Sequence, residues 1–143
     1  MISAESSVEV EQNKALVRRL MQGVYGERNV DVIDEVAAPD FTGSIPGRTF
    51  ESTEAWKAYN RGSLAAFPDF VYTIHDLFAE GDRVALRWTL TGTHLGPYGG
   101  LEPTGKRVDV SGIFICQCAN GRIVKSWGAW DTATVMRQLG ALQ

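Results

Sequence analysis

The stretch RVDVSGIFICQCANGRIVKSWGAW, residues 107–130, contains two runs of β-favouring residues separated by Asn120-Gly121. Asn-Gly is the strongest short signal for a two-residue hairpin turn, because both residues tolerate the positive φ angles that this turn requires. The runs from Arg107 to Ala119 and from Arg122 to Trp130 are therefore predicted to be the strands of a long antiparallel hairpin.

A second hairpin is predicted immediately before the first. The runs from Phe70 to Ala79 and from Arg83 to Thr93 are rich in β-favouring residues and are joined by Glu80-Gly81-Asp82. The segment from Leu95 to Gly105 is too rich in glycine and proline to be regular structure, so it is predicted to be a loop between the hairpins. The segment from Thr132 to Leu139 is typical of a closing helix.

The first half of the chain has helical periodicity instead. Apolar residues between Val10 and Val24 fall on one stripe, which predicts an amphipathic helix. Asn29 is expected to cap a short second helix that ends before Pro39. A third helix is predicted to begin at the cap Ser52 and to stop at Pro68. Its predicted buried stripe consists of Trp56, Tyr59, Leu64 and Phe67.

These elements predict one α+β domain over residues 1–143, in which residues 1–8 form a flexible N-terminus. The three N-terminal helices should cover one face of the curved antiparallel sheet that follows them. A sheet that curls around helices forms a cone, and the open end of such a cone is a pocket. We therefore expect a central apolar pocket.

Composition excludes several classes of partner. The net charge of −3 and a pI near 5.4 provide no basic surface for nucleic acid. No apolar run approaches the roughly 20 residues that span a bilayer, and the N-terminal residues are polar and acidic, so neither a membrane segment nor a secretion signal is predicted. Cys116 and Cys118 are two residues apart in one predicted strand, where a Cα separation of roughly 6.6 Å and side chains that point the same way disfavour a mutual disulfide, so reduced thiols and a cytoplasmic location are expected.

Several short motifs, in this order and spacing, resemble the SnoaL-like polyketide cyclases. The resemblance covers nearly the whole chain and implies the cone-shaped fold of the nuclear transport factor 2-like superfamily. That superfamily contains both cofactor-free enzymes and pure binding modules, so it does not by itself imply a reaction. The motifs are Phe67-Pro68-Asp69-Phe70, Gly81-Asp82-Arg83-Val84, Gly92-Thr93-His94-Leu95-Gly96, Pro103-Thr104-Gly105, Asn120-Gly121-Arg122-Ile123, Trp127-Gly128-Ala129-Trp130-Asp131 and Gln138-Leu139-Gly140.

The chain departs from this family at its acid/base positions. In the resembling cyclases an aspartate on the last strand and a histidine on the preceding strand act in catalysis, and the corresponding residues are Gly128 and Phe114. In the related limonene epoxide hydrolase, an arginine and an aspartate of the central strand correspond to Trp88 and Leu90. A glycine cannot transfer a proton, so neither mechanism is expected through these positions.

The same correspondence predicts what lines the pocket. Side chains alternate across a strand, so the residues that share a face with these positions should also surround the pocket. The predicted lining is aromatic and apolar, which suits a planar polycyclic ligand. It consists of Trp88, Leu90, Val110, Phe114, Ser126 and Trp130.

Two polar residues are candidates for catalysis. Asp131 is the acid that remains in the terminal motif, although an aspartate directly before a helix is also a typical N-cap. His94 lies at a strand end beside the glycine-rich loop, where it can donate to a ligand carbonyl or bond the loop backbone.

Further polar residues are candidates for ligand binding. Arg87 can bind a ligand carboxylate, or form an ion pair on the sheet. Tyr59, like Tyr25 and Tyr98, can stabilise an enolate with its hydroxyl group, or serve in packing. The histidines His75 and His94 are far apart and belong to no metal-binding motif, so neither a metal nor another cofactor is predicted.

Two hypotheses follow for function. The first is a cofactor-independent enzyme of polyketide or related secondary metabolism, of cyclase, isomerase or hydroxylase type, that acts on a small aromatic or polycyclic substrate with Asp131 and His94 as polar participants. The alternative is a non-catalytic binding or accessory protein that has lost the acid/base pair. In either case the uncovered sheet face predicts a homodimer through the sheet.

Overall fold

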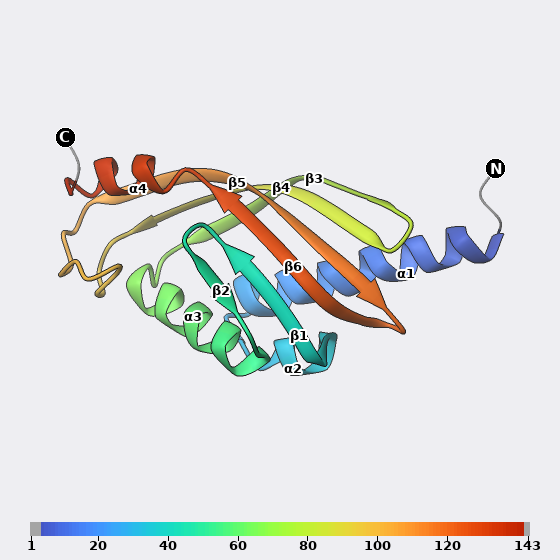
Figure 1. Cartoon of the computed structure of the whole chain (residues 1–143). Helices are drawn as coiled ribbons and strands as arrows, with labels where there is room; N and C mark the ends of the chain where they lie inside the picture. The colour runs from blue at the N-terminus through green and yellow to red at the C-terminus, as the bar shows by residue number, and fades with distance from the viewer. Residues whose placement is uncertain (1–3, 142–143) are drawn as a thin grey trace.

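A computed structural model describes residues 4–141 and has the predicted α+β class, with a curved sheet packed on helices. The helices α1, α2 and α3 lie against one face of the sheet, and α4 follows its last strand (Figure 1). In chain order the elements are α1 (Ala4–Met21), the π-helical turn η1 (Gln22–Gly26), α2 (Val32–Val36), β1 (Ala37–Ile45), β2 (Arg48–Phe50), α3 (Thr53–Ala66), β3 (Val71–Glu80), β4 (Arg83–Thr93), β5 (Arg107–Ala119), β6 (Arg122–Trp130) and α4 (Thr132–Gln138).

The two predicted hairpins form most of the sheet. Strands β4, β5 and β6 have the predicted bounds, and β3 is shifted by one residue. The strand order is β2-β1-β6-β5-β4-β3, and every neighbouring pair is antiparallel except β1 with β6, which is parallel. The hairpin of β1 and β2, which lies between α2 and α3, was not predicted. Its first strand contains Pro39, Asp40 and Gly43, which are poor strand formers, and it depends on pairing with the distant β6.

The starts of two helices differ from their predictions. Helix α1 begins at Ala4 instead of Val10, so residues 4–8 of the segment that was expected to be flexible are helical, while residues 1–3 lie outside the described part. Asn29 does not cap α2 directly, because its Oδ1 accepts from the amide of Asp31, one residue before the helix begins. By contrast, Ser52 caps α3 as predicted, with its Oγ accepting from the Ala55 amide at 3.1 Å.

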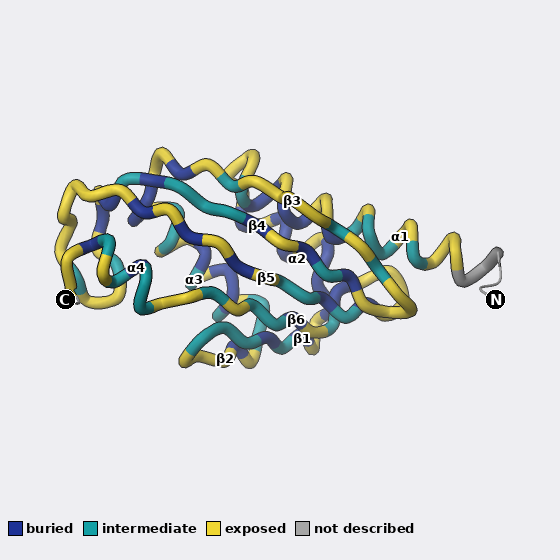
Figure 2. Tube along the Cα trace, turned by 90° about the horizontal axis from the view of Figure 1, so that it is seen from above, coloured by how far each residue is buried: buried dark blue, intermediate teal, exposed yellow. Residues whose placement is uncertain are grey.

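The core lies between the helices and the inner face of the sheet. Buried and exposed residues alternate along β4 and β5, as Figure 2 shows, so each strand turns one row of apolar side chains inward. Cys116 and Cys118 belong to this inner row and are free thiols. Within residues 4–141, no helix is long and apolar enough to cross a membrane.

Candidate functional site

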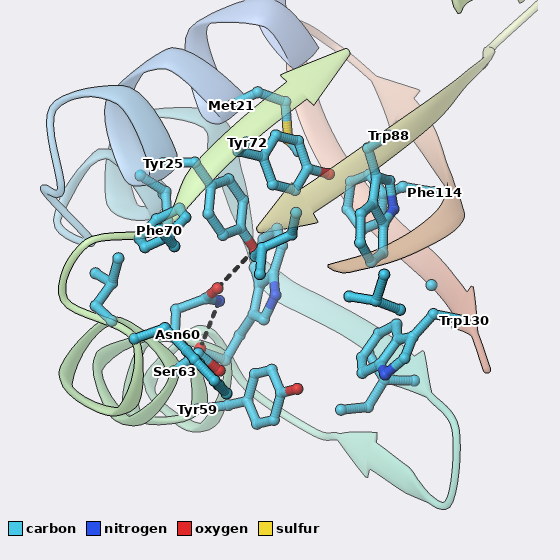
Figure 3. A pocket seen from close by; sticks show the side chains of 18 of the residues that line it. Met21, Tyr25, Tyr59, Asn60, Ser63, Phe70, Tyr72, Trp88, Phe114 and Trp130 are labelled. Atoms are coloured by element: carbon cyan, nitrogen blue, oxygen red, sulfur yellow. Dashed lines mark hydrogen bonds between the residues drawn. The ribbon is translucent and has the colours of Figure 1, made fainter. Parts of the chain in front are cut away.

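A cavity of about 110 Å³ lies between the inner face of the sheet and the helices. Its walls come from α1 and η1, from α3, from β3 to β6 and from the loop after β4, so it occupies the place that the sequence predicted for a pocket (Figure 3). Among the described residues, the lining includes no Asp, Glu, His, Lys, Arg or Cys. The polar groups that reach this cavity are therefore neutral.

The sheet side of the cavity is an aromatic wall. The rings of Trp88 and Trp130 meet edge to face with their centroids 6.0 Å apart, and Phe114 lies beside them. Gly112 makes room for this arrangement, because a Cβ at that position would collide with the Trp88 indole and with the Ala129 carbonyl oxygen. Flat aromatic surfaces of this kind favour a planar apolar ligand.

The helical side carries a chain of hydrogen bonds. The Tyr25 hydroxyl donates to Asn60 Oδ1 at 2.7 Å, and Asn60 Nδ2 donates to the Trp56 carbonyl oxygen at 3.0 Å. The hydroxyl groups of Tyr59 and Ser63 lie on the same side, and the Tyr59 hydroxyl points across the cavity toward Trp130 (Figure 3).

Burial also determines the charge state of these phenols. It raises the pKa of Tyr25, Tyr59, Tyr72 and Tyr98, because the phenolate form would lose its hydration in the apolar surroundings. Each of the four tyrosines is therefore a neutral hydrogen-bonding group at physiological pH.

Most of the predicted lining residues do face the cavity. These are Trp88, Leu90, Val110, Phe114, Trp130 and Tyr59. Ser126 is buried but lies outside the cavity, with its Oγ packed against Gly43 of β1. Arg87 is on the opposite face of the sheet, where its Nε donates to Asp76 Oδ2 at 2.7 Å. The alternation that turns Trp88 inward places Arg87 outward, which agrees with the ion-pair interpretation.

Asp131 does not line the cavity. It is exposed and caps α4, with its carboxylate accepting from the Thr134 amide at 3.1 Å and from the Thr134 hydroxyl at 2.7 Å. These two hydrogen bonds lower the pKa of Asp131. The structure thus places Asp131 in its capping role, ionised and away from the aromatic wall.

His94 is also outside the lining, although it lies directly behind it. The residue is fully buried, and its ring packs against Phe67 and Tyr98, which do line the cavity. Its Nδ1 accepts from the Thr104 amide at 3.2 Å, so a neutral ring carries its proton on Nε2. That Nε2 has no hydrogen-bond partner among the described residues. His75 is exposed on the outer sheet face, 2.7 Å from the Thr89 hydroxyl.

Asn60 was missed, although the sequence contains a signal for it. It lies one helical turn after Trp56, within the predicted buried stripe of α3, and a buried polar residue in such a stripe needs a partner. Tyr72 and Gly112 could be found only from the strand register, whereas Tyr25 was already a candidate and the π-helical turn brings its hydroxyl to Asn60. Within residues 4–141 no cluster of three or more His, Cys, Asp or Glu residues is arranged to hold a metal ion.

The fold and cavity define a class of protein in which a curved sheet and helices enclose an apolar cavity. Solved structures of the same kind cover almost the whole chain. A proposed SnoaL-like polyketide cyclase from Jannaschia sp. CCS1 is 28% identical, with a TM-score of 0.86 over 94% of this chain and 95% of that one. AclR, a proposed hydroxylase from Streptomyces galilaeus, is 29% identical, with a TM-score of 0.82 over 94% and 88%. TsrD from Streptomyces laurentii is 27% identical, with a TM-score of 0.82 over 92% and 97%.

A sequence model of the SnoaL-like polyketide cyclase family matches residues 15–139. The chain belongs to this family, as its motifs indicated. No curated protein sequence matches it.

Proposed function

We propose that this protein is a cofactor-independent enzyme that binds a small aromatic or polycyclic substrate of the polyketide class and promotes ring closure or isomerisation in it. The observation that carries the proposal is the enclosed cavity, with an aromatic wall on the sheet side and neutral hydroxyl groups on the helical side. Family membership and neighbours described as a cyclase and a hydroxylase support it.

The cavity favours catalysis by orientation rather than by a charged acid or base. A methylene group between two carbonyl groups enolises without help, and ring closure then requires the enol carbon to lie against the carbonyl carbon that it attacks. Holding the two groups together can lower the activation free energy by several kcal/mol, with about 7–11 kcal/mol as the upper range for well-oriented groups. The aromatic walls restrict the substrate to compact, planar shapes.

Tyr59 is the proposed electrophilic partner in this reaction. Its neutral hydroxyl points into the cavity and can donate to the substrate carbonyl oxygen as negative charge develops there. The role differs from the one expected for Asp131 and His94, which the structure keeps outside the lining. As the C–C bond forms, the enol oxygen releases its proton and the attacked carbonyl oxygen takes up one, so the phenol only donates a hydrogen bond to that oxygen and keeps its own proton.

The test combines binding with product formation. Aromatic polyketide intermediates are titrated while tryptophan fluorescence reports binding, and the products are followed by mass spectrometry. Wild-type protein should convert a bound intermediate faster than buffer does. Tyr59→Phe should bind with similar affinity but convert it more slowly, whereas the control Asp131→Asn should convert it at the wild-type rate.

A non-catalytic binding protein is the second candidate, and one observation favours it. Gly128 and Phe114, which stand at the acid/base positions of the resembling cyclases, are direct partners across β5 and β6 and both line the cavity. Tight binding with no conversion above the buffer rate would establish this second function. Absence of binding by any aromatic intermediate would contradict both candidates.

A further inference from the structure

The orientation of the Asn60 side chain is determined by its surroundings. The residue is buried on α3, and one end of its amide faces the backbone carbonyl oxygen of Trp56 at 3.0 Å. A carbonyl oxygen can only accept a hydrogen bond, so the facing atom must be Nδ2. Oδ1 therefore faces Tyr25, and the Tyr25 hydroxyl must donate its proton to it.

This bond leaves the Tyr25 oxygen able to accept a hydrogen bond from a ligand but not to donate one. The single phenolic proton is already directed at Asn60, so what the Tyr25 oxygen offers to a ligand is its remaining lone-pair capacity. Burial raises the pKa of Tyr25, which keeps the hydroxyl protonated and the bond to Asn60 intact. In Figure 3 the Tyr25 oxygen lies on the helical side of the cavity, with Trp88 and Phe114 on the other side.

Tyr25 is held firmly in this position. It lies in the π-helical turn η1, and its ring stacks on Tyr72 with centroids 4.5 Å apart and planes 10° apart. Phe70 contacts the same ring edge to face at 5.9 Å. Fixed aromatic contacts on two sides keep the acceptor in place before a ligand arrives, which reduces the entropy lost on binding.

We propose that the pair Tyr25–Asn60 selects ligands that carry a hydroxyl group, a phenol or an enol, by accepting that hydroxyl on the Tyr25 oxygen. An ether or a carbonyl oxygen at the same place would face the Tyr25 oxygen with no proton between the two acceptors. Such ligands are rejected because neither partner can then be satisfied. The inference rests on the proposed function, since it requires that the cavity binds aromatic molecules.

Three simple probes test this selection by equilibrium dialysis: 2-naphthol, 2-methoxynaphthalene and naphthalene. They share one ring system and differ in whether they offer a donor, only an acceptor, or neither. A neutral hydrogen bond is worth about 0.5–1.5 kcal/mol, so the wild type should bind 2-naphthol about 2- to 12-fold more tightly than 2-methoxynaphthalene. The extra methyl group favours the ether hydrophobically, so a preference for the hydroxyl would not arise from apolar area.

Two variants separate the roles of the partners. Tyr25→Phe removes the acceptor and should abolish the preference for 2-naphthol. Asn60→Leu has a similar shape but frees the Tyr25 proton, so 2-methoxynaphthalene should gain affinity relative to 2-naphthol. Affinity for naphthalene within about twofold of wild type shows that a variant has kept its cavity. If Tyr25→Phe loses the cavity, the change of preference in Asn60→Leu tests the acceptor role of Tyr25 instead.

The outcomes distinguish this inference from the function on which it rests. If wild type binds none of the three probes, the proposed function fails and the inference fails with it. If naphthalene binds but 2-naphthol is not preferred, or if the preference survives in Tyr25→Phe, the acceptor role of Tyr25 is refuted while the cavity function stands.

Discussion

Gly112 and Gly128 lie on the neighbouring strands β5 and β6 and both turn toward the aromatic wall, but they differ in the space around them. A Cβ at Gly128 would lie 3.4 Å from Ile45 Cγ2 and 3.5 Å from Trp130 Cζ3, which is ordinary van der Waals contact. A Cβ at Gly112 would lie 2.7 Å from the Ala129 carbonyl oxygen and would penetrate the Trp88 indole. Neither glycine has a positive φ, so space is the difference between them.

The two alanine variants therefore form a matched pair. Overpacking costs about 1–3 kcal/mol, so Gly112→Ala should lower the free energy of unfolding by that amount. For a chain of this size each kcal/mol corresponds to roughly 2–4 °C, which predicts a fall in Tm of about 2–12 °C. Gly128→Ala meets no collision and lowers the entropy of the unfolded chain, so it should be neutral or stabilising by up to about 1 kcal/mol.

Thermal unfolding followed by circular dichroism measures both changes, and the near-ultraviolet spectrum reports whether the Trp88 indole has moved. In Gly112→Ala the displaced indole should also weaken naphthalene binding. The reasoning would be refuted if Gly112→Ala melted within about 1 °C of wild type, or if Gly128→Ala fell as far as Gly112→Ala.

Three further predictions concern residues outside the cavity. Asp131→Ala should lower Tm because α4 loses its cap, while ligand affinity stays unchanged. A loss of ligand affinity in this variant would mean that Asp131 contributes to the binding site. Burial holds the pKa of Cys116 well above its usual range and raises the pKa of Cys118 to about 11. Both thiols should therefore resist a thiol reagent at pH 8 until the protein unfolds, and rapid labelling of the native protein would contradict this prediction. We propose a homodimer through the outer sheet face, where Phe78 is 63% exposed and belongs to a row across four strands that consists of Phe78, Ala85, Ile115 and Trp127. Wild-type protein should then sediment as a dimer and Phe78→Glu as a monomer. A wild-type monomer at micromolar concentration would exclude this dimer.

Local sequence signals predicted the elements whose structure is determined locally. The Asn120-Gly121 turn and the runs beside it predict the bounds of β5 and β6, although the pairing register of this hairpin shifts between Gln117 and Cys118. Strand β1 has no such signal. It pairs in parallel with β6 across about 80 residues of chain, and its register shifts between Ala37 and Thr42, around Pro39. Tertiary pairing determines this strand, so a local pattern could not predict it.

The same distinction applies to the site. The family resemblance placed Trp88 and Phe114 at the pocket, and strand alternation then added Trp130 to the same wall. The polar side depends on how the helices lie against the sheet, and Tyr25 reaches Asn60 from 35 residues away through a π-helical turn. Asp131 and His94 were adjacent to the right elements, but helix capping and the loop amide of Thr104 already engage them.

The surroundings of Gly128 predict how a carboxyl group would behave there, because a Cβ at this position would meet only ordinary van der Waals contacts. Gly128→Asp would place a carboxyl group beside Phe114, Trp130 and Ile45, where desolvation should raise its pKa above the unfolded value of about 3.9. In that case the folded protein holds a proton that the unfolded chain has released. Relative to Gly128→Asn, the free energy of unfolding of Gly128→Asp should then fall by about 1.4 kcal/mol per pH unit from the unfolded pKa up to the folded pKa, and stay level above it.

Denaturant unfolding of the two variants between pH 4 and pH 8 would measure this difference. A difference that does not change with pH would mean that the new carboxylate reaches water, and therefore that the cavity is not the dry, apolar site on which the proposed function depends. A falling difference would show that the fold can still hold a carboxylic acid in its neutral form against the aromatic wall. The absence of a carboxyl group at this position would then be a property of one side chain and not of the shape of the cavity.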